Sequence, residues 1–301
     1  MPVPKSTYLF LAVGLIAASQ SGNLIRIGQA PAVAMAAWRL ALASLLLAPL
    51  AGKGLGQLRA LSRVQWALVL VAGAALAAHL VAWIAAVQLT TVANAAFFFS
   101  VNPVMIATAA HLLYKEQIRS RIALAVGFGL AGVLLMGWHD LDLSRRLLAG
   151  DAVALLSAAF FAAYFLLGKR LRRTLDTRVY VCALYATAAA CCFLCVAFMG
   201  VPVIAYDRRT WVCFALLALV PTLIGHTSLN HALRYLGAGW ISCATLSEAP
   251  LAGLVAAIAW NERPPPSALA GYLVTSLSVV VLVLDRGPAN SAPPVPGGCA
   301  N

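Results

Sequence analysis

The chain has 301 residues, of which 62% are hydrophobic and only 10% are charged. A soluble domain carries about 25% charged residues, so this composition excludes a water-soluble globular protein. The net charge is +12, with 21 Lys and Arg residues against 9 Asp and Glu residues. In a membrane protein such an excess indicates positively charged cytoplasmic loops, and we therefore exclude nucleic acid as a partner. We expect an all-α integral membrane protein whose surroundings are the lipid bilayer.

Ten hydrophobic segments are long enough to span a bilayer, which needs about 20 apolar residues per helix. Five of the seven tryptophans fall at or near their ends, where an amphipathic indole ring is stable at the membrane interface. The first segment also resembles a cleavable signal peptide, with Ala17-Ala18-Ser19 as the small-residue site, but its removal would leave nine segments. The predicted spans are 6–25, 32–50, 65–87, 91–113, 119–137, 150–168, 179–199, 211–232, 239–260 and 267–284.

The distribution of positive charge predicts the orientation. With the N-terminus in the cytoplasm, the inner segments hold 14 Lys and Arg residues and the outer segments hold 6, while Arg39 lies within the second span. Positive residues concentrate on the cytoplasmic side, so both termini are predicted to lie there, in a bacterial inner membrane. The Pro- and Gly-rich segment 287–301 is predicted to be a disordered cytoplasmic tail.

The two halves of the chain repeat one pattern. His79 precedes Pro103 by 24 residues and His226 precedes Pro250 by 24 residues, and a glutamate follows each proline, at Glu116 and Glu262. The third to fifth spans thus correspond to the eighth to tenth. Five spans per half place the second copy in the membrane upside down, which is the inverted repeat of secondary transporters. We expect a first repeat at 1–147 and a second at 148–286.

These residues resemble the EamA-type branch of the drug/metabolite transporter superfamily. The first half carries LAAHLVAWIAAVQLTTVANAAFFFSVNPVMIA and the second carries PTLIGHTSLNHALRYLGAGWISCATLSEAPLAGLVAAIAWNERP. The resemblance covers nearly all ten spans and implies a permease, with export favoured over import. The family moves amino acids, sugars, nucleotide derivatives and drugs, so the resemblance does not give the substrate. In Glu248-Ala249-Pro250 the carboxylate stands one residue earlier than usual, which turns it by about 100° around the helix.

Two residues are candidates for proton coupling. Glu248 is the only carboxylate placed well inside a predicted span, where a charge costs about 2.5–3.5 kcal/mol, so it should face a cavity or a partner. His226 lies one turn before Asn230 and one turn after Thr222, which makes a polar stripe on the eighth span. The alternative for both is structural, with a protonated carboxyl or an imidazole holding helices together by hydrogen bonds.

Other polar residues inside the spans are candidates for the substrate path. Trp83 offers an apolar surface one turn after His79, and Arg39 offers a charge for an acidic substrate group or a neighbouring carbonyl. Pro103 and Pro250 are expected to kink their helices, either for gating or as static packing features. The predicted path residues are His79, Trp83, Asn94, Asn102, Asn230 and Arg39.

Nothing in the sequence indicates an enzyme, a cofactor or a metal site. It has no zinc-protease pattern, nucleophile elbow or phosphate-binding loop, and Cys191, Cys192 and Cys195 have no His or carboxylate at matching spacing in their span. The sequence therefore predicts a secondary transporter of a small organic metabolite that works by alternating access. A passive channel or facilitator without ion coupling is the alternative, and an intramembrane enzyme or a scaffold is a more distant one.

Overall fold

The regular structure in the computed structural model is entirely helical over the residues that it describes. These are residues 3–90, 92–115, 117, 119–137, 145–172, 175–259, 261 and 264–284. Nine helical segments in these ranges are long and apolar enough to cross a membrane. The segment predicted as the fifth span is also an apolar helix, α7 (Ser120–Gly137), but it is shorter. The multi-pass helical architecture is thus confirmed, while the count of ten spans stays a prediction.

The helices follow one another in an order that matches the predicted spans, several of which are divided into two or more segments. Their bounds are α1 Lys5–Ser19, α2 Ser21–Ile25, α3 Ala32–Ala51, η1 Gly52–Ala60, α4 Arg63–Leu89, α5 Val92–Phe99, α6 Asn102–Tyr114, α7 Ser120–Gly137, α8 Arg145–Leu171, α9 Thr177–Phe198, α10 Arg208–Leu217, η3 Ala218–His226, α11 Thr227–Ala232, α12 Ala238–Ala244, η4 Thr245–Ser247, α13 Glu248–Ala259 and α14 Pro266–Leu284.

Short polar residues set the starts of three long helices. Ser62 and Gln65 form a reciprocal capping box at the start of α4, and Asp176 accepts a hydrogen bond from the first turn of α9. Asp207 accepts one from the backbone N–H of Thr210 at the start of α10, and hydrogen bonding to Thr210 lowers the pKa of the Asp207 carboxyl. These caps satisfy N–H groups that a helix leaves unpaired at its N-terminus.

The two expected kinks are breaks between helices. Pro103 lies in the first turn of α6, after α5 has ended at Phe99. Pro250 lies in the first turn of α13, which a 3₁₀ turn separates from α12. A proline is tolerated in a first turn because the N–H that it lacks has no partner there in any case. Both prolines therefore start a helix, and the interruption precedes them.

A third interruption was not expected from the sequence. The segment η3, Ala218–His226, is a π-helix with Pro221 inside it. Proline cannot donate the usual hydrogen bond, and a wider turn takes up the mismatch. The wider turn changes the spacing of the predicted polar stripe, so Thr222 and His226 contact different partners.

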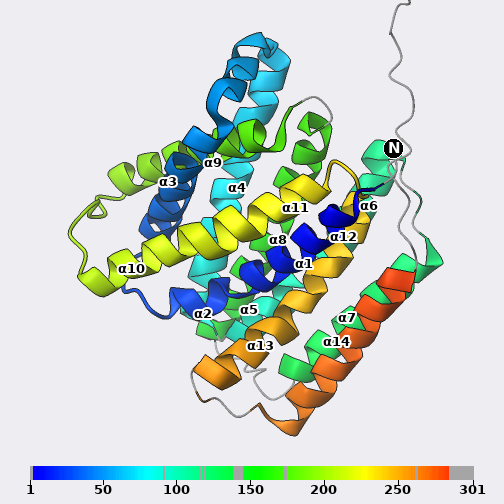
Figure 1. The fold of residues 1–301 in the computed structure, drawn as a ribbon. Helices are drawn as coiled ribbons and strands as arrows, with labels where there is room; N and C mark the ends of the chain where they lie inside the picture. The colour runs from blue at the N-terminus through cyan, green and yellow to red at the C-terminus, as the bar shows by residue number, and fades with distance from the viewer. Residues whose placement is uncertain are drawn as a thin grey trace, which may run out of the picture.

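The long helices pack as pairs from different halves of the chain (Figure 1). α4 packs along α8, α3 along α9 and α7 along α14, while α1 runs beside η3 and α11. The α7–α14 pair is close enough to need glycine, because a Cβ on Gly132 would lie 2.7 Å from the carbonyl oxygen of Gly271. Small residues of this kind allow backbones to approach within a membrane.

Large apolar side chains cover the outside of the bundle. Phe198 is 88% exposed and Ile258 is 85% exposed, and long stretches of α1, α7 and α14 also present leucine, isoleucine or valine outward. Such a surface is stable in lipid and unstable in water. The protein is therefore a multi-pass membrane protein.

Some predictions concern residues outside the described part of the chain, and others differ from the structure. Glu116, Glu262 and the tail 287–301 lie outside the described residues. The boundary between residues 147 and 148 falls within the first turn of α8. Arg172 is one of the 14 Lys and Arg residues that the sequence assigns to the inner segments, but its side chain is fully buried and donates hydrogen bonds to the backbone carbonyls of Leu175 and Asn230 and to the hydroxyl of Thr177.

Candidate functional site

Arg39 lies at the centre of the bundle, on α3, with no exposed surface. Its Nε donates to Oγ1 of Thr222 over 2.5 Å, and its Nη1 donates to Oγ of Ser21 over 3.0 Å. Its Nη2 is buried and has no hydrogen-bond partner. The predicted neighbouring carbonyl is thus replaced by two hydroxyls, one from each half of the chain.

Ser21 joins Arg39 to the predicted tryptophan. Its Oγ also accepts a hydrogen bond of 3.2 Å from Nε1 of Trp83. The ring centroid of Trp83 lies 5.3 Å from that of Phe99, so the indole combines a polar contact on α2 with an aromatic contact on α5. The arrangement fixes the ring and presents its face to the space between these helices.

The two predicted histidines come together from the two halves. The ring centroids of His79 and His226 are 6.0 Å apart. Nδ1 of His79 lies 2.9 Å from Oγ of Ser157, and Nδ1 of His226 lies 3.0 Å from the hydroxyl of Tyr164. Both histidines thus contact α8 through Nδ1, and both line the smaller cavity.

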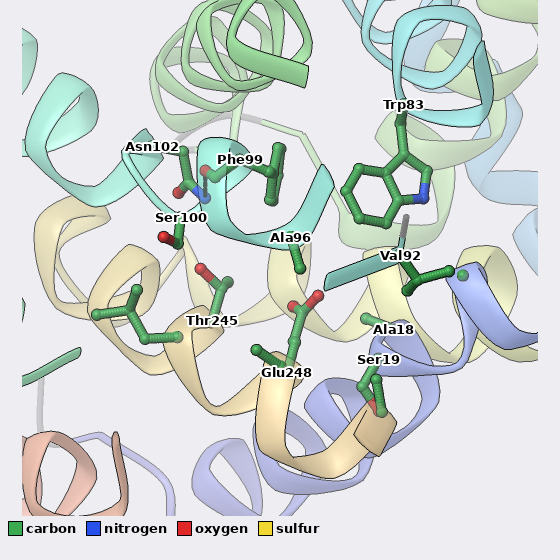
Figure 2. Close-up of a pocket in the computed structure, with 14 residues that line it drawn as sticks. Ala18, Ser19, Trp83, Val92, Ala96, Phe99, Ser100, Asn102, Thr245 and Glu248 are labelled. Atoms are coloured by element: carbon green, nitrogen blue, oxygen red, sulfur yellow. Dashed lines mark hydrogen bonds between the residues drawn. The ribbon is translucent and has the colours of Figure 1, made fainter. Parts of the chain in front are cut away.

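Glu248 stands where two cavities meet. The larger cavity, with about 500 Å³ of empty space when its open side is included, is lined by apolar side chains together with Ser19, Ser100, Asn102 and Thr245. The smaller, with about 420 Å³ of empty space on the same basis, is lined by Arg39, both histidines and Phe161. Ala18, Trp83, Phe99 and Glu248 line both. Figure 2 shows the Glu248 carboxylate extending from the start of α13 into the larger cavity, below Ala96.

The break before α13 places this carboxylate. Because α12 ends at Ala244 and the 3₁₀ turn covers Thr245–Ser247, Glu248 is the first residue of a new helix. A carboxylate is favoured at a helix N-terminus, where N–H groups are unpaired. The side chain also lines the smaller cavity together with Arg39.

The three predicted asparagines lie in different environments. Asn102 lines the larger cavity and donates to the carbonyl of Phe99 over 3.0 Å. Asn94 is fully buried but lines neither cavity. Asn230 also lines neither. Its Nδ2 donates to the backbone carbonyl of His226, and its backbone carbonyl accepts a hydrogen bond from Arg172. The structure thus brings Arg39, His79, Trp83, Asn102, His226 and Glu248 around the two cavities and leaves Asn94 and Asn230 apart.

Sequence reasoning did not select three residues of this site. Phe99 and Phe161 form aromatic walls with His79, and Tyr164 holds His226. One signal was available on α8, where Ser157, Phe161 and Tyr164 are spaced at three to four residues and therefore share a face. That spacing by itself does not distinguish a cavity wall from a helix contact.

In the part of the chain that the structure describes, no group of three or more His, Cys, Asp or Glu side chains is arranged to hold a metal ion. Cys191, Cys192 and Cys195 are free thiols. The site instead consists of one cation, one carboxylate, two imidazoles and several aromatic rings. This set of groups can bind a small organic molecule with a polar end and can take up a proton.

Comparisons with known proteins bear on the family and the fold of the chain. The model of the EamA-like transporter family matches the chain twice, over residues 5–138 and 148–284. A solved structure described only as "Crystal structure of protein" superposes with a TM-score of 0.77 at 16% identity, covering 94% of this chain and 98% of that chain. Among the curated proteins, none matches this sequence. The structural likeness shows the fold alone, whereas the family match covers both halves.

Proposed function

Since the chain belongs to the EamA-like transporter family and is a membrane transporter of the drug/metabolite transporter superfamily, we propose that it moves a small organic metabolite by alternating access. The observation that carries this proposal is the cavity pair at the contact between the two halves. Arg39, His79 and Trp83 come from the first half, and His226 and Glu248 come from the second. A site between two repeats is where a rocking carrier holds its substrate.

The packing supports two inverted repeats of five helices, at 1–147 and 148–286. In the repeat, α4 corresponds to η3 with α11, and α8 corresponds to α1. The α4–α8 contact therefore has an equivalent in the contact of η3 and α11 with α1, and both contacts are present. Two further contacts, α3–α9 and α7–α14, join corresponding helices and are unchanged when the halves are exchanged. α7 runs beside the spanning helix α14, which supports counting it as a tenth span.

We assign the proton-coupling role to Glu248 with His226. Glu248 lines both cavities, so a change in its charge affects the whole binding space. His226 faces the smaller cavity beside His79 and Arg39. A carboxyl in a low-dielectric cavity that meets a cation in one state and not in the other takes up and releases a proton as the conformation changes.

Transport by the purified protein in vesicles tests this function. We expect a metabolite panel to include compounds that accumulate when a pH gradient is imposed, and this accumulation to be lost in Glu248→Gln. Asp151→Asn is the matched control, because Asp151 is a buried carboxylate on α8 that lines neither cavity. Unchanged pH-driven accumulation in Glu248→Gln would remove that residue from the mechanism.

Countertransport distinguishes the carrier from the passive channel. A carrier exchanges labelled substrate for unlabelled substrate on the far side, and its turnover is limited by the conformational change. Flux far above such turnover, with no acceleration by unlabelled substrate, would establish the channel.

Labelling of introduced cysteines tests the orientation, with both termini in the cytoplasm of a bacterium. Arg172 is unsuitable for labelling because it is buried, whereas Arg59 and Arg209 are exposed. In intact cells an impermeant maleimide should react at Arg209→Cys and fail at Arg59→Cys, with the parent protein as the background. The reverse pattern would invert the proposed orientation.

A further inference from the structure

The guanidinium of Arg39 is held in place while one of its nitrogens is left without an acceptor. Nε and Nη1 are bound by Thr222 and Ser21, and Nη2 is buried without a partner. A buried donor on a charged group is unstable unless something accepts from it. Because Arg39 lines the smaller cavity, an acceptor that enters this cavity can reach the guanidinium once the surrounding side chains move.

Among the described residues that line the two cavities, Glu248 is the one carboxylate, and it is therefore the anionic competitor for this nitrogen. The titratable groups near Arg39 in the described part of the chain include Tyr164, Tyr185, Cys213, Glu248, His79 and His226. The hydroxyls of Tyr164 and Tyr185 are bound to His226 and Thr227, and the thiol of Cys213 donates to the carbonyl of Leu24. Glu248 is the carboxylate of this group, and it faces the same cavity as Arg39.

We propose that the substrate is an organic monocarboxylate whose carboxylate binds the free nitrogen of Arg39 in competition with Glu248. This inference rests on the proposed transport function. Among the described residues that line the two cavities, Arg39 is the only lysine or arginine, so a single negative charge balances it. A doubly charged phosphate monoester would bring a second charge without a partner, which is costly in a buried site.

The rest of the cavity fits an apolar body. Trp83 and Phe99 line both cavities, and the larger cavity continues past them among alanine, valine and leucine side chains. Rings of this kind bind apolar groups by their faces. A carboxylate at Arg39 therefore places its apolar part against Trp83 and Phe99 and extends it toward Glu248.

The competition links the substrate to a proton. When Glu248 is ionised, its charge compensates Arg39, and when it is protonated, the substrate carboxylate takes that place. Binding of the carboxylate is thus accompanied by uptake of one proton at Glu248. As the pH rises and Glu248 ionises, affinity for the carboxylate falls.

Binding to the purified full-length protein in detergent tests the proposal with matched compounds. Phenylacetate, phenylacetamide, phenethylamine and benzylphosphonate share one ring and differ in the polar group, and hexanoate replaces the ring by an alkyl chain. We expect each carboxylate to bind about tenfold or more tightly than phenylacetamide. We expect this preference to disappear in Arg39→Gln and to persist in part in Arg39→Lys.

The pH dependence gives a second measurement that does not need an arginine variant. Affinity for phenylacetate should fall with rising pH in the wild-type protein and stay constant in Glu248→Gln. Equal binding of acid and amide, stronger binding of the amine or phosphonate, or no binding of either carboxylate at millimolar concentration overturns the proposal. An unchanged pH dependence in Glu248→Gln overturns the competition.

Flux measured in vesicles separates this inference from the proposed function. Carboxylate binding that needs Arg39, without any flux, contradicts the transporter and leaves the anion site intact. Flux of amines or neutral compounds that is the same in Arg39→Gln and wild type contradicts the anion site and leaves the transporter intact.

Discussion

Two arginines, Arg39 and Arg172, are completely buried among the residues whose burial the structure describes, and their surroundings differ. Arg172, after the end of α8, donates through Nε to the carbonyl of Asn230 and through its other two nitrogens to the carbonyl of Leu175 and the hydroxyl of Thr177. Arg39 has two nitrogens bound and one without a partner, beside a cavity. A guanidinium with an acceptor on each of its three nitrogens stabilises the chain around it. A guanidinium with one nitrogen that has no acceptor can still bind a ligand through that nitrogen.

The position of each arginine fits this difference. Arg172 closes the turn between α8 and α9 and reaches α11, so its contacts join three elements of the second half. Arg39 is bound by Ser21 of the first half and Thr222 of the second, so its contacts cross the proposed rocking interface. The comparison thus separates a region that should stay rigid from one that should change during transport.

The largest expected effect is at Arg172. Arg172→Met leaves the two carbonyls and the hydroxyl without their donor, and hydrogen bonds to a charged group are worth about 1.5–3 kcal/mol each. We expect a loss of stability of roughly 3 kcal/mol or more, seen as a lower unfolding temperature in detergent and poor recovery of monodisperse protein. Arg172→Lys is the control and should recover part of the loss. An unfolding temperature of Arg172→Met equal to that of the wild type would contradict the structural role of Arg172.

At Arg39 the large effect is expected on function. Arg39→Gln removes the charge but keeps a hydrogen-bonding side chain, so stability should change by less than about 1 kcal/mol, because relief of the unmet donor offsets the lost bonds. Transport should fall about thirtyfold or more, as truncating one side of a buried charged contact costs about 2 kcal/mol or more. A variant that unfolds like Arg172→Met would make both arginines structural.

A second region that should stay rigid, the α7–α14 pair, can be tested without changing a charge. In Gly132→Ala the new methyl group would lie 2.7 Å from the carbonyl oxygen of Gly271 and force α7 away from α14, at a cost of about 1–3 kcal/mol. Gly127→Ala, on the same helix, meets no atom within 4 Å and should be neutral or stabilising. Equal unfolding temperatures for the two variants would contradict the packing of this pair.

The smallest effect is expected at Trp83. Trp83→Phe removes the hydrogen bond to Ser21 and keeps an aromatic ring against Phe99, so the loss should be about 0.5–1.5 kcal/mol. Substrate affinity should decrease a few-fold, measured by concentration dependence of uptake, with little change in maximal rate. Trp83→Leu also loses the ring and should weaken affinity further. Identical affinities of both variants and wild type would exclude the indole from the path.

Much of the fold was predictable because membrane spans are read directly from hydropathy. The second predicted span, 32–50, agrees with α3 at Ala32–Ala51, and the tenth, 267–284, agrees with α14 at Pro266–Leu284. The breaks in the fourth and ninth spans lie within a few residues of Pro103 and Pro250, as predicted, whereas the π-helix around Pro221 was not predicted. Proline identifies a weak point, but whether a helix bends, breaks or widens depends on what packs beside it.

The candidate site was predictable in its residue types and not in its geometry. Polar residues in apolar spans identified Arg39, His79, His226 and Glu248, since lipid does not tolerate them. Thr222, His226 and Asn230 were predicted to form one polar stripe, but Thr222 binds Arg39, His226 lines the smaller cavity, and the backbone carbonyl of Asn230 binds Arg172. Arg172 was counted with the inner charges, because the sequence does not show that the carbonyls of Leu175 and Asn230 accept hydrogen bonds from its side chain.

The sequence by itself determined the membrane class, the repeated halves and the small set of buried polar residues, because each follows from the transfer of side chains between water and lipid. Only the tertiary structure decided which of these residues meet. The 6.0 Å approach of His79 and His226, the place of Glu248 between two cavities and the unmatched nitrogen of Arg39 depend on helix rotation and crossing. Many rotations bury the same apolar area, and specific packing, such as that of Gly132 on Gly271, selects one of them.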